Sequence, residues 1–200
     1  MSAIPKHKMT MEEYIEFDKN NEGRWEYFDG EVIDMAGGTL NRNQIASNIS
    51  RILGNKLEDN GCRALPGDMR LKVPKALPYR YPDVVVVCGE PIIETIQGQE
   101  MLVNPLLIIE VLSPSTAVYD YSTKFTAYQL IDSFQEYLLV AQDRPRITQY
   151  VRQPNGQWLR SDLEGAESAL ILASVDCKLT FSEIYSLVKF PPTQSVIRPV

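Results

Sequence analysis

The chain has 200 residues, 44% hydrophobic and 23% charged, a balance typical of a protein that buries a core rather than of a disordered one. Uninterrupted apolar runs such as Val84 to Cys88 are far shorter than the roughly 20 residues of a membrane-spanning helix. The net charge is −6 and no apolar secretory stretch follows the N-terminus, so we expect one cytoplasmic domain over residues 1–200, with flexible or extended tails at 1–9 and 191–200.

The N-terminal part of the chain predicts two helices separated by a hairpin. Thr10 and Glu13 form a capping-box pattern, which predicts a helix over residues 11–20. An Asp-Gly turn between apolar stretches predicts a β-hairpin over residues 24–35. Apolar residues at helical spacing predict a second helix over residues 45–60, which an Asn-Gly pair ends.

The middle of the chain predicts the centre of a β-sheet. Short strands are expected at residues 62–65 and 69–73, and two strongly apolar strands at 83–87 and 106–112. The apolar strands lack the alternation of apolar and polar residues, which indicates that both faces of the sheet are covered there. A wide hairpin loop over residues 89–104 is expected to join them.

The last third adds a helix, a strand, a second hairpin and a closing helix. We expect these elements at residues 117–132, 136–141, 147–162 and 181–189, the last of them after a capping box at Thr180. Strands with helices before and after them predict a single α/β (α+β) domain, in which a central mixed sheet is flanked by helices.

Cysteine and histidine usage excludes several kinds of site. Cys62, Cys88 and Cys177 are widely spaced and form no C-x-x-C pair, so the sequence predicts neither a disulfide framework nor a structural zinc site. His7 is the only histidine and lies in the N-terminal arm, which excludes His-centred zinc hydrolases and argues against a Ser-His-Asp mechanism. Polar chemistry must come from carboxylates, lysines, tyrosines or a bound metal.

Positive charge is concentrated in one part of an otherwise acidic chain. Residues 40–80 carry eight basic and three acidic residues, a net charge of +5, so the remainder carries −11. Such a basic patch is compatible with a nucleic-acid partner. Arg42, Arg51 and Lys72 are the candidate DNA contacts, and the alternative is an ordinary solvated helix face and strand edge.

Two carboxylates lie in the apolar strands at the centre of the predicted sheet. Glu110 is surrounded by leucine, isoleucine and valine, where an ionised carboxylate is costly unless a positive charge opposes it. Asp83 begins the other apolar strand. Lys124 lies on the helix that follows, and Tyr128, interpreted as a packed core residue, shares its helical face.

Two acids and a lysine in one pocket suit metal-dependent hydrolysis of a phosphodiester. Carboxylate oxygens hold Mg²⁺ or Mn²⁺, and the metal activates a water while the lysine orients that water or opposes the negative charge. A buried Glu110–Lys124 ion pair without a catalytic role would give the same sequence, and this alternative stays open.

The order of these residues resembles the PD-(D/E)XK nuclease superfamily, and more closely its bacterial branch known as putative restriction endonucleases, a domain of unknown function. The matching text spans roughly residues 10 to 190 and comprises, in order, Tyr27-Phe28-Asp29-Gly30-Glu31-Val32, Tyr81-Pro82-Asp83-Val84-Val85-Val86, Ile109-Glu110-Val111-Leu112-Ser113-Pro114-Ser115-Thr116, then Asp120, Lys124 and Tyr128, and Glu136-Tyr137-Leu138-Leu139-Val140.

This resemblance implies a restriction-endonuclease-like fold, a metal site and DNA cleavage. It assigns Asp83 and Glu110 as metal ligands, Glu26 as a further acid that some members contribute, and Lys124 as the lysine of the motif. The resemblance therefore names four residues for the metal and the catalytic step.

Three positions depart from the pattern that the resemblance implies. Leu112 stands where the superfamily motif carries its lysine, two residues beyond the glutamate, so the lysine is displaced to the following helix. Arg42 occupies a position where relatives often carry histidine, and Tyr121 one where many carry arginine. These changes can preserve binding and reduce turnover.

The sequence thus predicts a Mg²⁺- or Mn²⁺-dependent endonuclease that cleaves double-stranded DNA. One alternative is an inactive nuclease-like fold that serves as a DNA-binding or assembly module, which the three departures and the acidic pI of 4.9 favour. Another is a metal-dependent hydrolase of a smaller phosphate ester. A homodimer is expected because a duplex has two strands to cut, with exposed apolar residues of the late hairpin, such as Trp158, at the interface.

Overall fold

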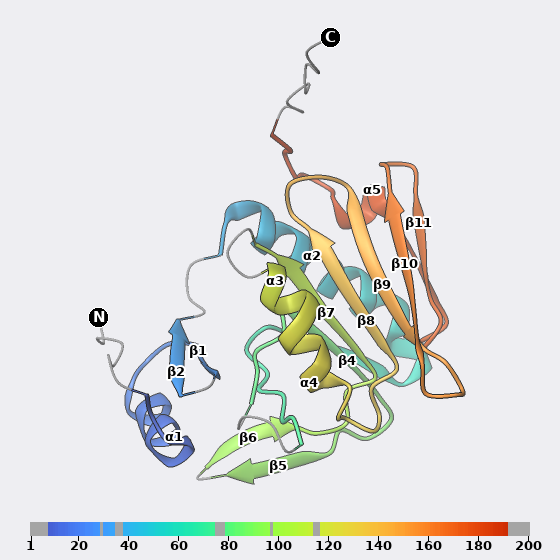
Figure 1. Ribbon diagram of the computed structural model, residues 1–200. Coiled ribbons are helices and arrows are strands. Elements are labelled where there is room, and N and C mark those ends of the chain that lie inside the picture. Colours follow the sequence, from blue (N-terminus) through green and yellow to red (C-terminus); the bar gives the residue numbers. More distant parts are fainter. Residues whose placement is uncertain are drawn as a thin grey trace.

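A six-stranded sheet of mixed direction forms the centre of the molecule, with helices on both faces (Figure 1). The computed structural model describes residues 8–28, 30–34, 38–74, 79–96, 98–113 and 117–191. In spatial order the strands are β10 (Trp158–Glu164), β9 (Arg146–Arg152), β8 (Glu136–Ala141), β7 (Leu107–Leu112), β4 (Val84–Cys88) and β3 (Cys62–Pro66). The predicted α+β architecture is confirmed; His7 and most of both predicted tails lie outside the described residues.

The two apolar strands predicted at the centre of the sheet are β4 and β7. Every residue of each strand except the last is buried. They pair antiparallel, with Val84 opposite Ile109, whereas β7 and β8 are parallel. A parallel connection must cross one face of the sheet, and here it runs through α3 (Ala117–Tyr119), the π-helical turn η2 (Asp120–Lys124) and α4 (Phe125–Tyr128). Lys124 therefore lies over the sheet.

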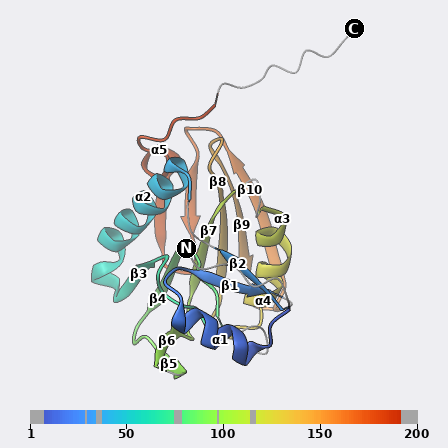
Figure 2. The same ribbon diagram turned by 90° about the vertical axis from the view of Figure 1, so that its left-hand side faces the viewer.

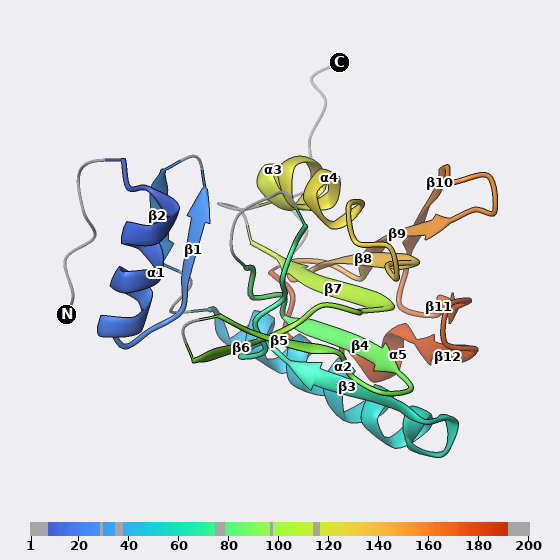
Figure 3. The same ribbon diagram turned by 90° about the horizontal axis from the view of Figure 1, so that it is seen from below.

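The faces of the sheet pack into separate hydrophobic clusters. One contains Val84 and Ile109 together with residues of α2 (Leu40–Leu57) and α5 (Phe181–Ile184). The other contains Val85 and Ile108 together with residues of α4. Figure 3 shows α2 on one side of the sheet and α3 and α4 on the other. Because side chains alternate along a strand, Glu110 shares the face of Ile108 and is directed toward the crossover helices.

The N-terminal segments pack beside the sheet, as Figures 1 and 2 show. Helix α1 (Met11–Asn20) begins with the predicted capping box, and the predicted hairpin is β1 (Trp25–Phe28) and β2 (Glu31–Asp34). An aromatic cluster joins them to the segment before β4; its members include Tyr14, Trp25, Tyr27, Tyr79 and Tyr81. This packing covers the hairpin, so most of β1 is buried.

Several predicted elements differ from the observed ones. Residues 69–73 form no strand but only isolated bridges at Leu71, and the expected loop over 89–104 contains the hairpin β5 (Ile93–Ile96) and β6 (Gln99–Leu102). The predicted helix over 117–132 is interrupted by the π-helical turn. The closing helix ends at Ile184, and Leu187 has a left-handed φ of 64°, which an α-helix does not accommodate.

Further corrections concern the C-terminal part. Strands β11 (Ala169–Leu172) and β12 (Cys177–Thr180) form a hairpin that the sequence analysis did not predict. Trp158, expected as an exposed interface residue, is only partly exposed, because its ring packs 4.9 Å from that of Phe134 and 5.2 Å from that of Phe125. Within the described residues, no helix combines the length and apolar character needed to cross a membrane.

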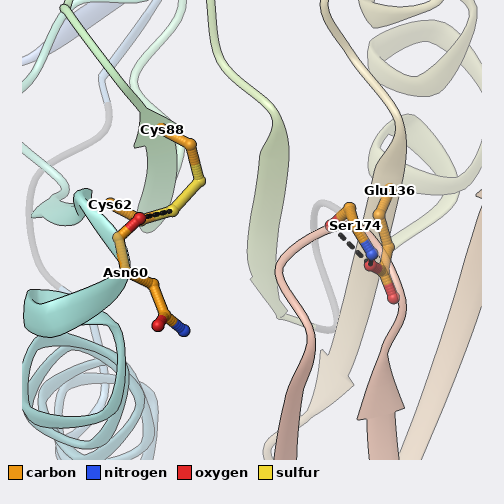
Figure 4. The surroundings of a disulfide bond; sticks show 5 residues. All are labelled: Asn60, Cys62, Cys88, Glu136 and Ser174. Carbon is orange, nitrogen blue, oxygen red and sulfur yellow. Dashed lines mark hydrogen bonds between the residues drawn. A yellow bond between two sulfur atoms is a disulfide. The ribbon is translucent and has the colours of Figure 1, made fainter.

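A disulfide bond links Cys62 on β3 to Cys88 on β4, which overturns the prediction that the cysteines form no bridge (Figure 4). The two residues are 26 positions apart in sequence but directly opposite each other in the antiparallel register. The prediction was wrong because strand pairing, not sequence spacing, brings them together. Cys177 is a free, buried thiol.

The second capping box gives a testable contribution to stability. Hydrogen bonds from Thr180 and Lys56 lower the pKa of Glu183 to about 2 from 4.5. A lowered pKa in the folded state stabilises the protein above pH 4.5, and this contribution disappears as the pH falls toward 2. We expect Glu183→Gln to reduce the free energy of unfolding by about 0.5–1 kcal/mol at pH 7 and by less at pH about 3. Urea unfolding at both pH values measures this, with Glu164→Gln as an exposed control; an equal loss at both would contradict it.

Candidate active site

A buried cluster of charged side chains surrounds Lys124. Its Nζ lies 3.1 Å from Oε1 of Glu110, 3.3 Å from Oε1 of Glu26 and 3.6 Å from Oδ1 of Asp120. The four side chains are between 0 and 4% exposed. Three carboxylates from separate parts of the chain thus share one ammonium group in the interior.

The crossover between β7 and β8 positions the lysine. Asp120 and Lys124 form the ends of the π-helical turn η2, and Tyr128 follows on α4. The Tyr128 hydroxyl donates to Oε1 of Glu110 at 2.9 Å, beside the Lys124 bond to the same oxygen. Single π-helical turns occur frequently at functional sites because they redirect side chains within a helix. Here the turn directs Lys124 and Tyr128 onto the carboxylate of β7.

Glu26 reaches the same cluster from strand β1. The backbone N–H of Tyr81 donates to its Oε1 at 3.0 Å, while its Oε2 is buried and has no hydrogen-bond partner among the described residues. The Glu26 side chain is fully buried under the N-terminal packing. Nearby, the buried Arg80 donates to the carbonyl of Tyr27 at 2.7 Å.

Burial and charge act in opposite directions on these groups. Burial lowers the pKa of Lys124, but the carboxylates around it outweigh that effect and raise its pKa above the ordinary value, so the amine stays protonated. Burial raises the pKa of Glu110 to about 8, although the Lys124 ammonium acts against this shift. Three acids, Glu26, Glu110 and Asp120, thus surround the Lys124 ammonium group.

Asp83 lies beside this cluster but has a different partner. Continuing the β4–β7 register by one residue places it opposite Glu110, and the backbone N–H of Val111 donates to its Oδ2 at 2.8 Å. Arg42, on α2, binds its carboxylate through Nε and Nη2, at 3.0 to 3.3 Å. The pKa of Arg42 is raised because Asp83 outweighs the effect of burial. This pair is the outward-facing part of the site.

A cavity of about 580 Å³ opens over Asp83 and Arg42. It lies along one side of α2, and its lining includes Arg24, Arg51 and Asp68. Three arginines against two acids give it a positive balance. The cavity can therefore receive an anion next to the Asp83 carboxylate.

Comparison with known proteins now identifies the family. The family model Uma2, described as "Putative restriction endonuclease", matches residues 11–182. The chain belongs to this family. Among its relatives, "Uncharacterized protein sll1609" of Synechocystis sp. is 36% identical over 162 residues, 81% of this chain and 91% of that protein. "Uncharacterized protein slr1290" of the same organism is 31% identical over 188 residues, 94% of this chain and 97% of that protein.

A solved structure shows the same fold. The crystal structure described as a putative nuclease belonging to DUF820 from Anabaena variabilis aligns with a TM-score of 0.71 at 17% identity, covering 89% of this chain and 98% of that one. The predicted restriction-endonuclease-like branch is thereby confirmed, as is the fold.

The predicted site residues of this Uma2 protein divide into two groups. Glu26, Glu110 and Lys124 come together in the buried cluster. Asp83 adjoins them on the neighbouring strand, where Arg42 binds it. Of the candidate DNA contacts, Arg42 and Arg51 line the cavity over Asp83, whereas Lys72 pairs with Glu94 on β5 and does not line it.

At this site, the buried charged residues Asp120 and Arg80 were not assigned roles from the sequence. Asp120 stands four residues before Lys124, the spacing of an ion pair within a helix, and that signal was available. Arg80 follows Tyr79 in a segment without clear periodicity, and nothing in the sequence indicates that it is 1% exposed.

The carboxylates of this Uma2 protein are of the kind that binds a divalent cation, although cationic side chains pair with them here. Within the described ranges, no three Asp, Glu, His or Cys side chains form a ready-made metal site. Lys124 and Arg42 bind the carboxylate oxygens instead. Carboxylate oxygens are the donors that Mg²⁺ and Mn²⁺ prefer, and Oε2 of Glu26 is an unpartnered acceptor inside the cluster. Binding of a metal therefore requires a cationic side chain to release an acid.

Proposed function

We propose that this Uma2 protein is a Mg²⁺- or Mn²⁺-dependent endonuclease that hydrolyses phosphodiester bonds in DNA. The observation that carries the proposal is the convergence of Glu26, Glu110 and Lys124 in the interior, next to Asp83, which lines a positively charged cavity. A purely structural ion pair needs one acid and one base, whereas here several carboxylates gather around one lysine. Membership of the Uma2 family supports a nuclease-like activity.

Each residue has a distinct part in the proposed reaction. Asp83, Glu110 and Glu26 would hold the metal, which supplies an activated water and stabilises charge on the phosphate. Lys124, kept protonated by its carboxylate neighbours, opposes the negative charge that develops on the phosphate oxygens. Arg42 leaves Asp83 and pairs with a phosphate, since a guanidinium binds phosphate and carboxylate with the same bidentate geometry.

The proposed substrate is double-stranded DNA, held through its phosphates. The arginines of the cavity, Arg24, Arg42 and Arg51, give the positive surface that a phosphate backbone requires. We also propose that the protein acts as a homodimer, because cleavage of both strands needs two sites. The proposed location is the cytoplasm. Leu159 and Ile171, 57% and 67% exposed, are the apolar residues that such an interface would cover. Light scattering that returns a monomer at micromolar concentration would contradict the dimer.

Plasmid cleavage tests the proposed activity. We expect the protein to nick and linearise supercoiled DNA with Mg²⁺ or Mn²⁺ and not with EDTA. Asp83→Asn should slow cleavage by more than about 100-fold, because it removes a metal ligand, whereas disturbing an outer partner of a ligand costs about 10- to 100-fold. Asp68→Asn is the matched control, because Asp68 lines the same cavity but has a side chain 94% exposed. Cleavage in EDTA, or equal rates for the two variants, would contradict the proposal.

A non-catalytic DNA-binding or assembly module is the second candidate function. The observation that favours it is the bidentate Arg42–Asp83 pair, which neutralises an acid that a metal needs. Calorimetric titration with Mn²⁺ separates the two functions. An endonuclease should bind the ion stoichiometrically and lose this binding in Asp83→Asn, whereas an inactive module should show no such binding.

A further inference from the structure

A second cavity, of about 650 Å³, lies at the carboxyl ends of the parallel strands β7 and β8 and takes no part in the proposed metal chemistry. Leu112 and Ala141 contribute from the ends of these strands, and Tyr150 and Arg160 from β9 and β10. The carboxyl edge of parallel strands, where the chain crosses over the sheet, is the usual position of ligand sites in open α/β sheets. Its volume is within the range of about 300–1,000 Å³ for ligand pockets.

Aromatic and arginine side chains form one wall of this cavity. The Arg160 guanidinium lies 5.7 Å from the ring centre of Tyr121 and 5.8 Å from that of Tyr150. The Tyr150 ring rests on Phe125 at 4.3 Å, and the Tyr121 hydroxyl pairs with Thr148 at 3.0 Å, so both rings are fixed from behind. The Arg160 side chain is 48% exposed.

The lining of this cavity has a positive balance of charge. Asp162, which lies outside the lining, forms ion pairs with two of its arginines. Arg144, Arg146 and Arg160 line it together with Asp143. Asp162 binds Arg146 at 3.3 Å and Arg160 at 3.1 Å. A hydrogen bond from Thr148 lowers the pKa of Asp162, so this carboxylate stays ionised. The ion pair with Asp162 therefore holds Arg160 in place over Tyr121 and Tyr150.

The cavity adjoins the candidate active site. Leu112 is two residues beyond Glu110 on the same face of β7. Gln142, also in the lining, accepts a hydrogen bond from Thr39, the N-cap residue of α2, one turn before Arg42. The Thr39–Gln142 bond therefore joins the N-terminal end of α2, which carries Arg42, to the lining of the second cavity.

We propose that this tyrosine–arginine cavity binds an unpaired nucleobase of the nucleic-acid substrate, an inference that rests on the proposed function. Aromatic rings and guanidinium planes stack on the face of a base, and the remaining arginines suit its phosphates. A base inside a duplex has both faces covered by its neighbours, so the site selects single-stranded, frayed or flipped-out nucleotides. The protein would hold such a base beside the phosphodiester bond that is hydrolysed.

A binding experiment without metal tests the site. The probes are a fluorescein-labelled oligothymidylate of about 12 nucleotides and an oligomer of equal length made of abasic sugar phosphates. Fluorescence anisotropy in EDTA gives the affinity of each. Stacking is worth about 1–3 kcal/mol per base, so Tyr150→Leu should weaken binding of oligothymidylate by about 5- to 150-fold and leave the abasic probe unchanged. Tyr150→Phe, which keeps the ring, should restore the wild-type affinity.

A second variant protects the test against a loss of folding in Tyr150→Leu. Arg160→Ala removes an exposed side chain, and its matched control, Arg152→Ala, lies on the adjacent strand outside the cavity. Arg160→Ala should weaken oligothymidylate more than the abasic probe, whereas Arg152→Ala should change neither by more than about 2-fold.

Two outcomes overturn the inference: equal losses on both probes, which would mean contact with phosphates alone, and no binding of oligothymidylate by the wild type. Absence of plasmid cleavage, with base-dependent binding retained, would instead remove only the proposed catalytic function.

Discussion

Replacing Lys124 by methionine is expected to lower the free energy of unfolding by about 3–5 kcal/mol, the range for breaking a buried ion pair by removal of one partner. Methionine has a similar length, so packing is largely kept while the positive charge is lost. Glu26, Glu110 and Asp120 would then share a dry interior without the ammonium that each contacts within 3.6 Å. Urea unfolding of both proteins at neutral pH measures the difference.

The matched control for this prediction is Lys56→Met. Lys56 also binds a glutamate, Glu183, at 2.9 Å, but its side chain is 38% exposed, and exposed ion pairs contribute about 0–1 kcal/mol. A double variant of Lys124→Met with Glu110→Gln should recover part of the lost stability, because one excess acid is removed with the cation. If Lys124→Met and Lys56→Met are equally stable, the cluster does not depend on its lysine.

The central part of the site was predictable because burial and charge conflict within one strand. Glu110 lies among aliphatic residues, which predicts that a cation or a metal must approach it, and the structure places Lys124 at 3.1 Å. The capping boxes at Thr10 and Thr180 are local patterns and occur as predicted. Signals of this kind depend on neighbouring residues alone.

Features that depend on tertiary packing were not predictable from the sequence. Glu26 is buried because α1 and the aromatic cluster cover its hairpin, and no local pattern around it indicates this. Cys62 and Cys88 meet only because β3 and β4 pair in one particular register. The cavity at Tyr121 and Tyr150 likewise combines a crossover helix with a strand, 29 positions apart in the chain.

Substitution of two buried glutamates, Glu136 and Glu110, can distinguish an effect on stability from an effect on catalysis. Glu136 on β8 is 0% exposed and accepts hydrogen bonds from Gln149 and Ser174 (Figure 4 shows the Ser174 pair). Neither partner belongs to the cluster around Lys124. Glu136→Gln leaves one of these donors facing an amide N–H₂, so we expect a loss of about 1–3 kcal/mol in the free energy of unfolding. Cleavage by the folded protein should be unchanged.

Glu110→Gln is expected to show the opposite pattern. The amide oxygen of glutamine can still accept from Lys124 and Tyr128, so the free energy of unfolding should change by less than about 1 kcal/mol. The negative charge that a divalent ion requires is lost, and plasmid cleavage should fall by more than about 100-fold, beyond the effect of disturbing an outer partner of a metal ligand. If Glu110→Gln cleaves DNA at the wild-type rate while Glu136→Gln does not, the buried cluster is a structural ion pair and the catalytic acids lie elsewhere.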